Sequence, residues 1–136
     1  MIMQKLLPRW TFLDYIDNRG NNRISEWLRS IPVKARVEFE SLLDTLRGTR
    51  LLDRPQTGKL HGNCEGLWEF VFKADNVQYR PLFCYGPDAK AREITILVGA
   101  IEKGSKLRPP GVCKIGLARK DEIMANRKRV VRHVRI

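Results

Sequence analysis

Apolar side chains near the N-terminus recur at the spacing of an α-helix. Four of them fall at positions i, i+3, i+4 and i+7 and so share one helical face: Ile24, Trp27, Leu28 and Ile31. The side chain of Asn21 or Asn22 is available to cap the first backbone N–H groups. Pro32 ends this pattern. The spacing therefore predicts a short helix from residue 23 to residue 31.

A second helical pattern follows directly. Pro32 suits the first position of a helix, and Gly48 is typical of its end. Five apolar residues between them share one face: Ala35, Phe39, Leu42, Leu43 and Leu46. The two helices form a helical hairpin, and their apolar faces need a sheet to cover.

Segments typical of β-strands lie on both sides of this hairpin. Residues 10–15 alternate weakly and run into a turn at Asp17–Gly20, which predicts a short opening strand. Three later segments are rich in aromatic and β-branched residues: Leu67–Lys73, Val77–Tyr85 and Glu93–Ile101. Short turns around residues 74–76 and 86–88 connect them, so we expect an antiparallel meander of three strands.

Alternation assigns the side chains of the first two meander strands to opposite faces. In the first strand, Trp68, Phe70 and Phe72 point away from Leu67, Glu69, Val71 and Lys73. In the second, Gln78, Arg80, Leu82 and Cys84 point away from Val77, Tyr79, Phe83 and Tyr85. Pro81 cannot donate a ladder hydrogen bond, which predicts an open edge or a bulge there.

The C-terminal quarter is predicted to be a basic loop and a basic helix. Residues 103–106 form a flexible loop with two lysines, and Pro109-Pro110 begins a last helix. Val112, Ile115 and Ala118 are expected to face inward, and the helix carries five cations toward the terminus: Arg127, Lys128, Arg129, Arg132 and Arg135. The fold class is therefore α+β, with an N-terminal helical hairpin packed on a small antiparallel sheet and a C-terminal helix.

Size and composition fit one domain spanning residues 1–136, extended by the basic helix or tail of residues 119–136. With 43% hydrophobic residues, 136 residues suffice for one core. Met1–Arg9 hold too short an apolar run for a signal peptide, and no stretch approaches the length of a membrane span, so we expect a cytoplasmic protein with no membrane partner.

The three cysteines show no pattern of a metal site. Cys64, Cys84 and Cys113 are an odd number, without the spacing of metal ligands, and neither His61 nor His133 forms a Cys/His cluster with them. We expect all three to be reduced and mostly buried thiols, and we expect neither a metal nor a cofactor.

Positive charge is concentrated in the last quarter of the chain. The net charge is +11, and residues 103–136 hold 11 basic and 2 acidic side chains against 15 and 13 in residues 1–102. Such a block is typical of a surface that binds nucleic acid or an acidic protein. The alternative is a basic tail that is merely solvated.

Several motifs follow one another in an order that identifies a family resemblance. After the opening strand and the hairpin come four segments: Lys59–Gly62, Gly66–Glu69, Tyr79–Phe83 and a strand ending in Glu102-Lys103. A lysine-bearing loop and a helix with Ala118 and Arg119 complete the series. Over about residues 12–126 the chain resembles the RelE/HigB superfamily of bacterial type II toxin–antitoxin toxins, in particular its phage-derived branch.

The resemblance implies an activity and two partners. Such toxins have a central antiparallel sheet flanked by N-terminal helices and cut mRNA in the ribosomal A site. An antitoxin, often a helix-turn-helix protein encoded beside the toxin, neutralises them. The resemblance thus implies an endoribonuclease that acts on mRNA on the ribosome and binds a cognate antitoxin.

Metal-free RNA cleavage needs a proton acceptor, a proton donor and cations around the phosphate. An arginine fork matches phosphate oxygens, and the Tyr-Arg motif of the family indicates Arg80 as that cation. The alternative is an ion pair of Arg80 with Glu69 or Glu93. The further catalytic candidates are Lys103, His61 and Glu102, and the RNA-binding candidates are Lys59, Lys106, Arg108, Arg127, Lys128 and Arg129.

Two departures from the family pattern keep other functions open. Many relatives have a basic residue where Val71 stands and a Lys-Lys pair where Glu102-Lys103 stands. One alternative is therefore a decayed toxin that binds RNA, DNA or an antitoxin without cutting. Another is a ParE-like inhibitor of DNA gyrase on the same fold.

Overall fold

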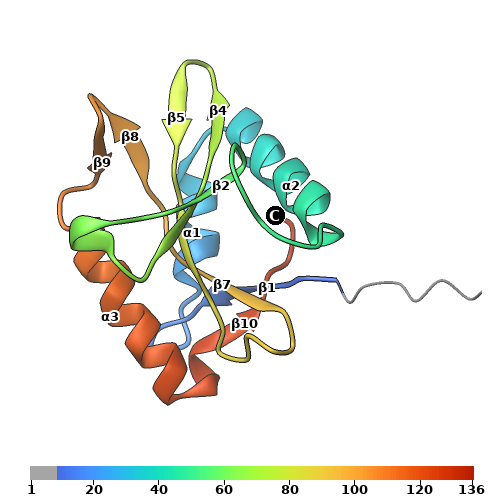
Figure 1. Cartoon of the computed structure of the whole chain (residues 1–136). Coiled ribbons are helices and arrows are strands. Elements are labelled where there is room, and N and C mark those ends of the chain that lie inside the picture. The colour runs from blue at the N-terminus through green and yellow to red at the C-terminus, as the bar shows by residue number, and fades with distance from the viewer. Residues whose placement is uncertain (1–8) are drawn as a thin grey trace, which may run out of the picture.

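Three α-helices pack against two β-sheets in residues 9–136, the part of the chain that the computed structural model describes (Figure 1). The helices are α1 (Arg23–Ser30), α2 (Val33–Arg47) and α3 (Val112–Ala125). The strands are β1 (Thr11–Tyr15), β2 (Thr57–Lys59), β3 (Trp68–Phe70), β4 (Phe72–Ala74), β5 (Val77–Tyr79), β6 (Leu82–Tyr85), β7 (Glu93–Val98), β8 (Ile101–Lys103), β9 (Lys106–Arg108) and β10 (Val130–Arg132). Two 3₁₀ turns, η1 (Gly62–Cys64) and η2 (Arg127–Arg129), complete them. The predicted α+β class is confirmed.

The larger sheet has the strand order β10-β1-β7-β6-β3-β2, and the smaller has the order β4-β5-β8-β9. All neighbouring strands are antiparallel except β1 and β7, which run parallel with Thr11 opposite Glu93. The predicted meander is confirmed as β3/β4, β5/β6 and β7/β8. Each of its three strands passes from one sheet into the other.

The passage between the sheets is a kink at the level of Arg80 and Pro81. Two backbone hydrogen bonds hold the strands together there, from Phe70 N to the Pro81 carbonyl (2.9 Å) and from Arg80 N to the Ala100 carbonyl (2.8 Å). The register between β6 and β7 shifts at Leu82/Phe83. Of the two expectations for Pro81, the bulge is therefore the one that the structure confirms.

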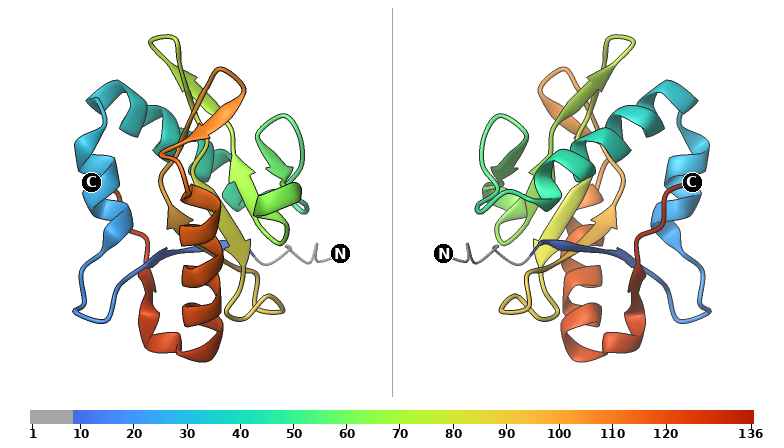
Figure 2. Two further views of the ribbon diagram at one scale, coloured as in Figure 1. Left: turned by 90° about the vertical axis from the view of Figure 1, so that its left-hand side faces the viewer. Right: turned by 90° about the vertical axis from the view of Figure 1, so that its right-hand side faces the viewer.

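The two faces of the larger sheet carry separate cores. One core joins α1 and α2 to aromatic residues of the sheet, and the other lies under α3 (Figure 2). The first contains Phe70, Tyr79 and Phe83, and the second contains Leu82 and Cys84. These memberships confirm the predicted alternation along the first two meander strands.

Helix α1 begins as predicted, whereas α3 is rotated from its predicted orientation. Asn22 caps α1, because its Oδ1 accepts hydrogen bonds from Ile24 N (3.0 Å) and Ser25 N (2.9 Å). In α3, Val112 is buried, but Ile115 and Ala118 are exposed, so the inward orientation predicted for these two residues is wrong. The buried face instead runs through Gly116, where a Cβ atom would lie 2.9 Å from the Leu67 side chain.

The segments on either side of α3 also differ from the prediction. Residues 103–106 are not a flexible loop but the tip of a hairpin, in which Lys103 lies opposite Lys106. Gly104 and Ser105 both have positive φ, as a two-residue hairpin turn of type I′ requires. The prediction that the last helix carries the basic residues toward the C-terminus is wrong beyond Ala125. Residues 127–129 form η2, and β10 then pairs with β1.

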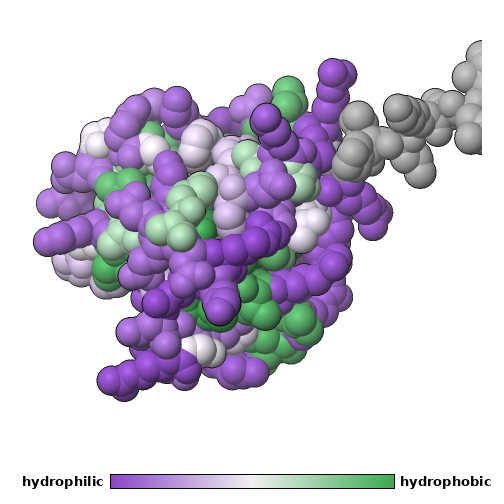
Figure 3. Space-filling view, turned by 90° about the horizontal axis from the view of Figure 1, so that it is seen from below, coloured by the Kyte–Doolittle hydropathy of each residue, from purple (hydrophilic) through white to green (hydrophobic). Residues whose placement is uncertain are grey.

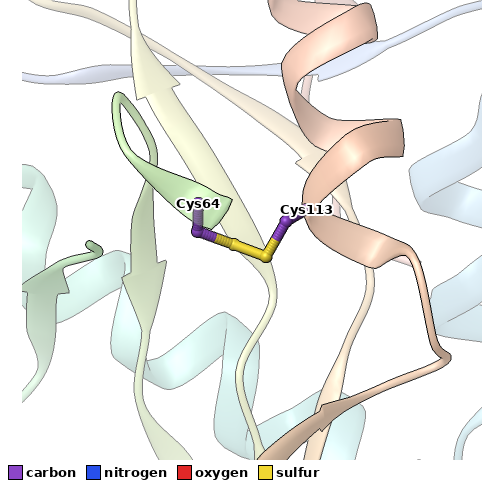
Figure 4. Close-up of a disulfide and its surroundings, with 2 residues drawn as sticks. All are labelled: Cys64 and Cys113. Carbon is purple, nitrogen blue, oxygen red and sulfur yellow. A yellow bond between two sulfur atoms is a disulfide. The ribbon is translucent and has the colours of Figure 1, made fainter. Parts of the chain in front are cut away.

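Two of the three cysteines form a disulfide, which corrects the expectation of three reduced thiols. Cys64 of η1 and Cys113 in the first turn of α3 are bonded across 49 positions of sequence (Figure 4). The fold brings their Cα atoms to 4.9 Å, and no local spacing signals this. Cys84 is a buried free thiol as expected, and burial raises its pKa to about 12.

A buried cluster of charges fastens the segment after β10 to the core. His133 Nδ1 lies 2.8 Å from Asp14 Oδ1, and its Nε2 lies 2.6 Å from Glu40 Oε1. The His133 side chain is only 2% exposed. The Asp14 carboxylate also accepts a hydrogen bond from Asn22, so the same cluster reaches the cap of α1.

Gly99 lies where Trp27 of α1 packs over the kinked sheet. A Cβ atom at this position would lie 2.1–2.2 Å from three atoms of the indole. We expect Gly99→Ala to lower the free energy of unfolding by about 1–3 kcal/mol, because the ring must move. Urea unfolding measures this, and Gly48→Ala, where a Cβ meets nothing within 4 Å, is the matched control.

None of the helices described over residues 9–136 has the length and apolar character needed to cross a membrane. The prediction about a signal peptide concerns Met1–Arg9, of which residues 1–8 lie outside the described part of the chain.

Candidate active site

Arg80 occupies the kink between β5 and β6 and is surrounded by acceptors. Its side chain is 13% exposed, and its Nη2 lies 3.1 Å from Glu102 Oε2, across from β5 on β8. Its Nε lies 3.8 Å from Glu69 Oε1 on β3. The guanidinium also donates to the Tyr79 carbonyl (2.9 Å) and to Gln78 Oε1 (3.0 Å). The kink thus holds the guanidinium between two carboxylates.

The ion-pair alternative for Arg80 is confirmed for Glu69 and wrong for Glu93. Glu93 pairs with Arg127 instead, through two hydrogen bonds between the guanidinium and the carboxylate. The side chain of Arg127 lowers the pKa of Glu93 below its ordinary value, despite the opposite effect of partial burial. Arg127 of η2 is therefore held at the first residue of β7, whereas Arg80 is hydrogen-bonded to Ala100, beyond the last residue of β7.

Arg54 is the second cation at Glu69. Its Nη1 lies 3.6 Å from Glu69 Oε2, and its guanidinium occupies the space that a side chain at Gly58 would fill. Gly58 lies opposite Glu69 in the β2–β3 register, so the missing side chain gives Arg54 access to the carboxylate. Burial raises the pKa of Glu69, although Arg80 and Arg54 act in the opposite direction.

These four side chains line a cavity of about 290 Å³, together with Leu60, Ser105 and Leu107. A second cavity of the same volume adjoins it, because Arg54 lines both. Lys59 and His61 line this second cavity. Lys59 Nζ lies 5.9 Å from the ring of Trp68, and the exposed His61 has its Nδ1 3.6 Å from Glu65. Arg54 thus connects Arg80 and Glu102 to two other predicted site residues.

Three predicted cations lie on the other face of the β8–β9 hairpin. Residues paired directly across strands share a face, and Lys103 pairs with Lys106 while Arg108 pairs with Ile101. Glu102 and Leu107 form the alternate pair, on the face of Arg80. Lys103, Lys106 and Arg108 therefore do not converge on Arg80, although they are close to it in sequence.

The remaining predicted cations lie at the opposite end of α3. The helix has 14 residues and so separates its two ends by about 20 Å. Lys128 and Arg129 belong to η2 beyond its C-terminal end, and β9 precedes its N-terminal end (Figure 1). That lower end is mostly hydrophilic when seen from below (Figure 3). The tail and the β8–β9 hairpin therefore form two separate basic regions.

Sequence reasoning missed Arg54 and considered Glu69 only as a partner of Arg80. Arg54 precedes a proline in the connection between α2 and β2, and nothing in its local sequence indicates a site. The signal for Glu69 was present, because alternation places it on the face opposite Trp68 and Phe70, with Arg80 on the neighbouring strand. Within residues 9–136, no group of three or more His, Cys, Asp and Glu side chains is arranged so that it could hold a metal ion.

Chemically, the site combines two guanidinium groups with two carboxylates in a partly closed cavity. Guanidinium groups bind phosphate oxygens, and a carboxylate whose pKa is raised by burial, as that of Glu69 is, is a stronger proton acceptor than an exposed one. The four formal charges cancel, so an entering phosphate must displace a carboxylate from Arg80 or bind through Arg54, whose side chain is 62% exposed.

Comparison with known proteins gives one match. The family model described as phage derived protein Gp49-like (DUF891) matches residues 26–121, which is more than half of the chain. The matched range includes most of α1, the whole meander, the site around Arg80 and most of α3. No curated protein and no solved structure matches the chain.

Proposed function

The chain belongs to the phage derived Gp49-like family, a toxin-like family, and from this premise we propose that it is the toxin of a type II toxin–antitoxin system. We assign it to the RelE/HigB kind, which cleaves mRNA on the ribosome without a metal. The motif order along the sequence supports this assignment. Its partners are then mRNA on the ribosome and a cognate antitoxin, of the helix-turn-helix type.

The observation that carries this proposal is the position of Arg80 between Glu69 and Glu102 in the kink of the sheet. The guanidinium is held 3.1 Å from one carboxylate and 3.8 Å from the other, at the wall of a cavity. A cation and proton acceptors fixed in one place reduce the reorganisation that a reaction requires. Arg54, at the rim, provides a second guanidinium for the same phosphate.

The proposed reaction uses the 2′-hydroxyl of the RNA. Glu69 accepts the hydroxyl proton, and the 2′-oxygen forms a bond to the adjacent phosphorus. The bond from phosphorus to the 5′-oxygen breaks, and His61 in the adjoining cavity protonates the leaving oxygen. Arg80 and Arg54 stabilise the extra negative charge of the transition state. The products are a 2′,3′-cyclic phosphate and a 5′-hydroxyl.

Arg80→Gln tests this role. We expect cleavage of mRNA on programmed ribosomes to fall by about 10²–10³-fold, because one charged donor to the reacting phosphate is lost. Glu69→Gln is expected to slow cleavage while keeping the shape of the side chain. Arg50→Gln removes an exposed arginine away from the cavity and is the control.

Thermal unfolding of each variant separates loss of chemistry from loss of fold. Folded Arg80→Gln protein that cleaves at the rate of the unchanged chain contradicts the assignment of Arg80. The appearance of 3′-hydroxyl ends, in place of cyclic phosphates, contradicts the proposed reaction.

One observation favours a second function, a module that binds RNA or an antitoxin without cutting. Arg80 already has four partners in Glu69, Glu102, Gln78 and the Tyr79 carbonyl, which leaves few donors for a substrate. A purified chain that shifts RNA in a gel but leaves message intact on programmed ribosomes establishes this alternative. Growth arrest on induced expression, together with cut message, establishes the first.

A further inference from the structure

A basic cleft of about 600 Å³, separate from the cavity at Arg80, lies beyond the end of β1. The last pair between β1 and β7 is Asp14 with Ile96, so β1 does not cover the end of β7 at Val98 or the following residues to Ala100. Three arginines from three elements line the cleft: Arg23 of α1, Arg108 of β9 and Arg119 of α3. The Trp27 side chain also lines it, and its single carboxylate is that of Glu26.

Two of the three guanidinium groups are held in place by the protein. Arg23 lies 2.7 Å from Asp17 and 2.9 Å from Glu26. Arg119 donates to the Leu97 carbonyl (2.8 Å) and lies over the Tyr15 ring at 4.6 Å. Such fixed arginines lose little conformational entropy on binding a ligand.

Arg108 differs from the other two arginines. It is exposed and forms no ion pair with any residue from 9 to 136. Burial lowers the pKa of Arg119 and the positive charge of Arg23 acts in the same direction, whereas Tyr15, Glu122 and Asp17 act against them. Arg23 is balanced by Glu26 and Asp17, so Arg108 and Arg119 are the two cleft arginines that are left to attract an anion.

We propose that this cleft binds a nucleotide of single-stranded RNA, with its phosphate on Arg108 and Arg119 and its base against the indole of Trp27. The volume is within the range of small-ligand sites. Guanidinium groups beside an aromatic ring are the combination that single-stranded RNA recognition uses. A carboxylate of an acidic peptide can bind to a guanidinium group, but it makes no stacking contact with the indole.

The cleft has a spatial relation to the candidate active site. Arg108 lies opposite Ile101 on one face of the β8–β9 hairpin, and Glu102 contacts Arg80 on the other face. Lys103 and Lys106 flank the turn between these faces. An RNA strand that passes over the turn reaches both sites, so the choice of RNA as the ligand rests on the proposed function.

Tryptophan fluorescence of the full chain with 5′-AMP as the probe tests the nucleotide site. We expect 5′-AMP to quench the emission and Trp27→Phe to remove most of this quenching, while Trp10 and Trp68 remain. Arg108→Gln is expected to weaken binding of 5′-AMP about tenfold, because one charged hydrogen-bonding group is lost. Arg50→Gln is the matched control and leaves binding unchanged.

Three results overturn the proposal. If adenosine binds as tightly as 5′-AMP, the cleft makes no contact with the phosphate. If inorganic phosphate binds as tightly as 5′-AMP, the cleft makes no contact with the base. An oligoglutamate peptide that displaces 5′-AMP at equal concentration assigns the cleft to an acidic protein partner instead.

Cleavage of message and binding of 5′-AMP, both measured on the unchanged chain and on Arg108→Gln, distinguish failure of this inference from failure of the proposed function. If the chain never cleaves message but binds 5′-AMP through Arg108, the proposed nuclease function is refuted and the nucleotide site in the cleft is supported. If the chain cleaves message and Arg108→Gln does not change the binding of 5′-AMP, the proposed nuclease function is supported and the nucleotide site in the cleft is refuted.

Discussion

Replacing His133 with alanine is expected to lower the free energy of unfolding by about 3–5 kcal/mol, because two buried carboxylates lose their shared partner. His133 bridges Asp14 on β1 and Glu40 on α2 at 2.8 and 2.6 Å, and Phe39 packs edge-on against its ring. The variant leaves Asp14 without its cation in the interior. Urea unfolding near neutral pH measures the loss.

The same residue predicts how stability depends on pH. Burial by itself lowers the pKa of His133, but the hydrogen bonds and negative charges of Asp14 and Glu40 raise it to about 9. A histidine in an unfolded chain has a pKa of about 6.5, so the folded state binds the proton more tightly. This contribution, about 3 kcal/mol, is fully present below about pH 6.5 and is lost as the pH rises through about 9.

The control for this pH dependence is His133→Gln, which keeps hydrogen-bonding groups but does not titrate. We expect its stability to change much less between pH 6.5 and 9 than that of the unchanged chain. His61→Gln, which alters an exposed ring, should retain the full pH dependence. Equal slopes for the unchanged chain and His133→Gln would show that His133 is neutral in the fold.

Removing the disulfide is expected to cost about 4 kcal/mol at 25 °C. The bond closes a loop across 49 positions, and opening it returns the corresponding chain entropy to the unfolded state. Either dithiothreitol or Cys113→Ala should therefore shift the urea midpoint to lower concentration. The unreduced, unfolded chain should show one reactive thiol, that of Cys84, and the reduced chain three.

The Cys113→Ala variant also controls for other effects of the reductant. Its stability should not change further when dithiothreitol is added, because no bond remains to be cut. Three reactive thiols in the unreduced chain would restore the sequence-based expectation of reduced cysteines.

Local patterns were sufficient for most of the secondary structure. The cap of α1 at Asn22, the two helices of the hairpin and the alternation of the meander each depend on residues within a few positions of one another. The same reasoning erred for α3, where Ile115 is exposed and Gly116 is buried. Gly116 is buried because the side chain of Leu67, which lies far away in sequence, approaches it closely.

The features that the sequence did not indicate all depend on distant contacts. The Cys64–Cys113 bond, the His133 cluster and the pairing of β10 with β1 join residues that lie from 49 to 119 positions apart. From the sequence, the basic residues after Asn126 are predicted to continue the last helix, with a solvated tail as the alternative. Only the fold shows that Val130 and His133 belong to the sheet edge and the core.

The candidate site was predicted in part for the same reason. Arg80 and Glu102 meet because neighbouring strands place them there, and the sequence offered both. Arg54 enters through the missing side chain of Gly58, which is a matter of tertiary packing. Lys103 follows Glu102 directly and therefore points to the opposite face, so proximity in sequence gave the wrong grouping.

The position of β1 has a consequence for how the chain folds during its own synthesis. This strand is made early, yet its two neighbours are β7 and β10, which are made late. Contacts so distant along the chain form slowly, because a long loop must close first. A nascent chain cannot complete its larger sheet until Arg132 has been synthesised. The α1–α2 hairpin has no sheet to cover its apolar faces until the meander through β7 has been synthesised, which makes this interval the one most exposed to misfolding and proteolysis.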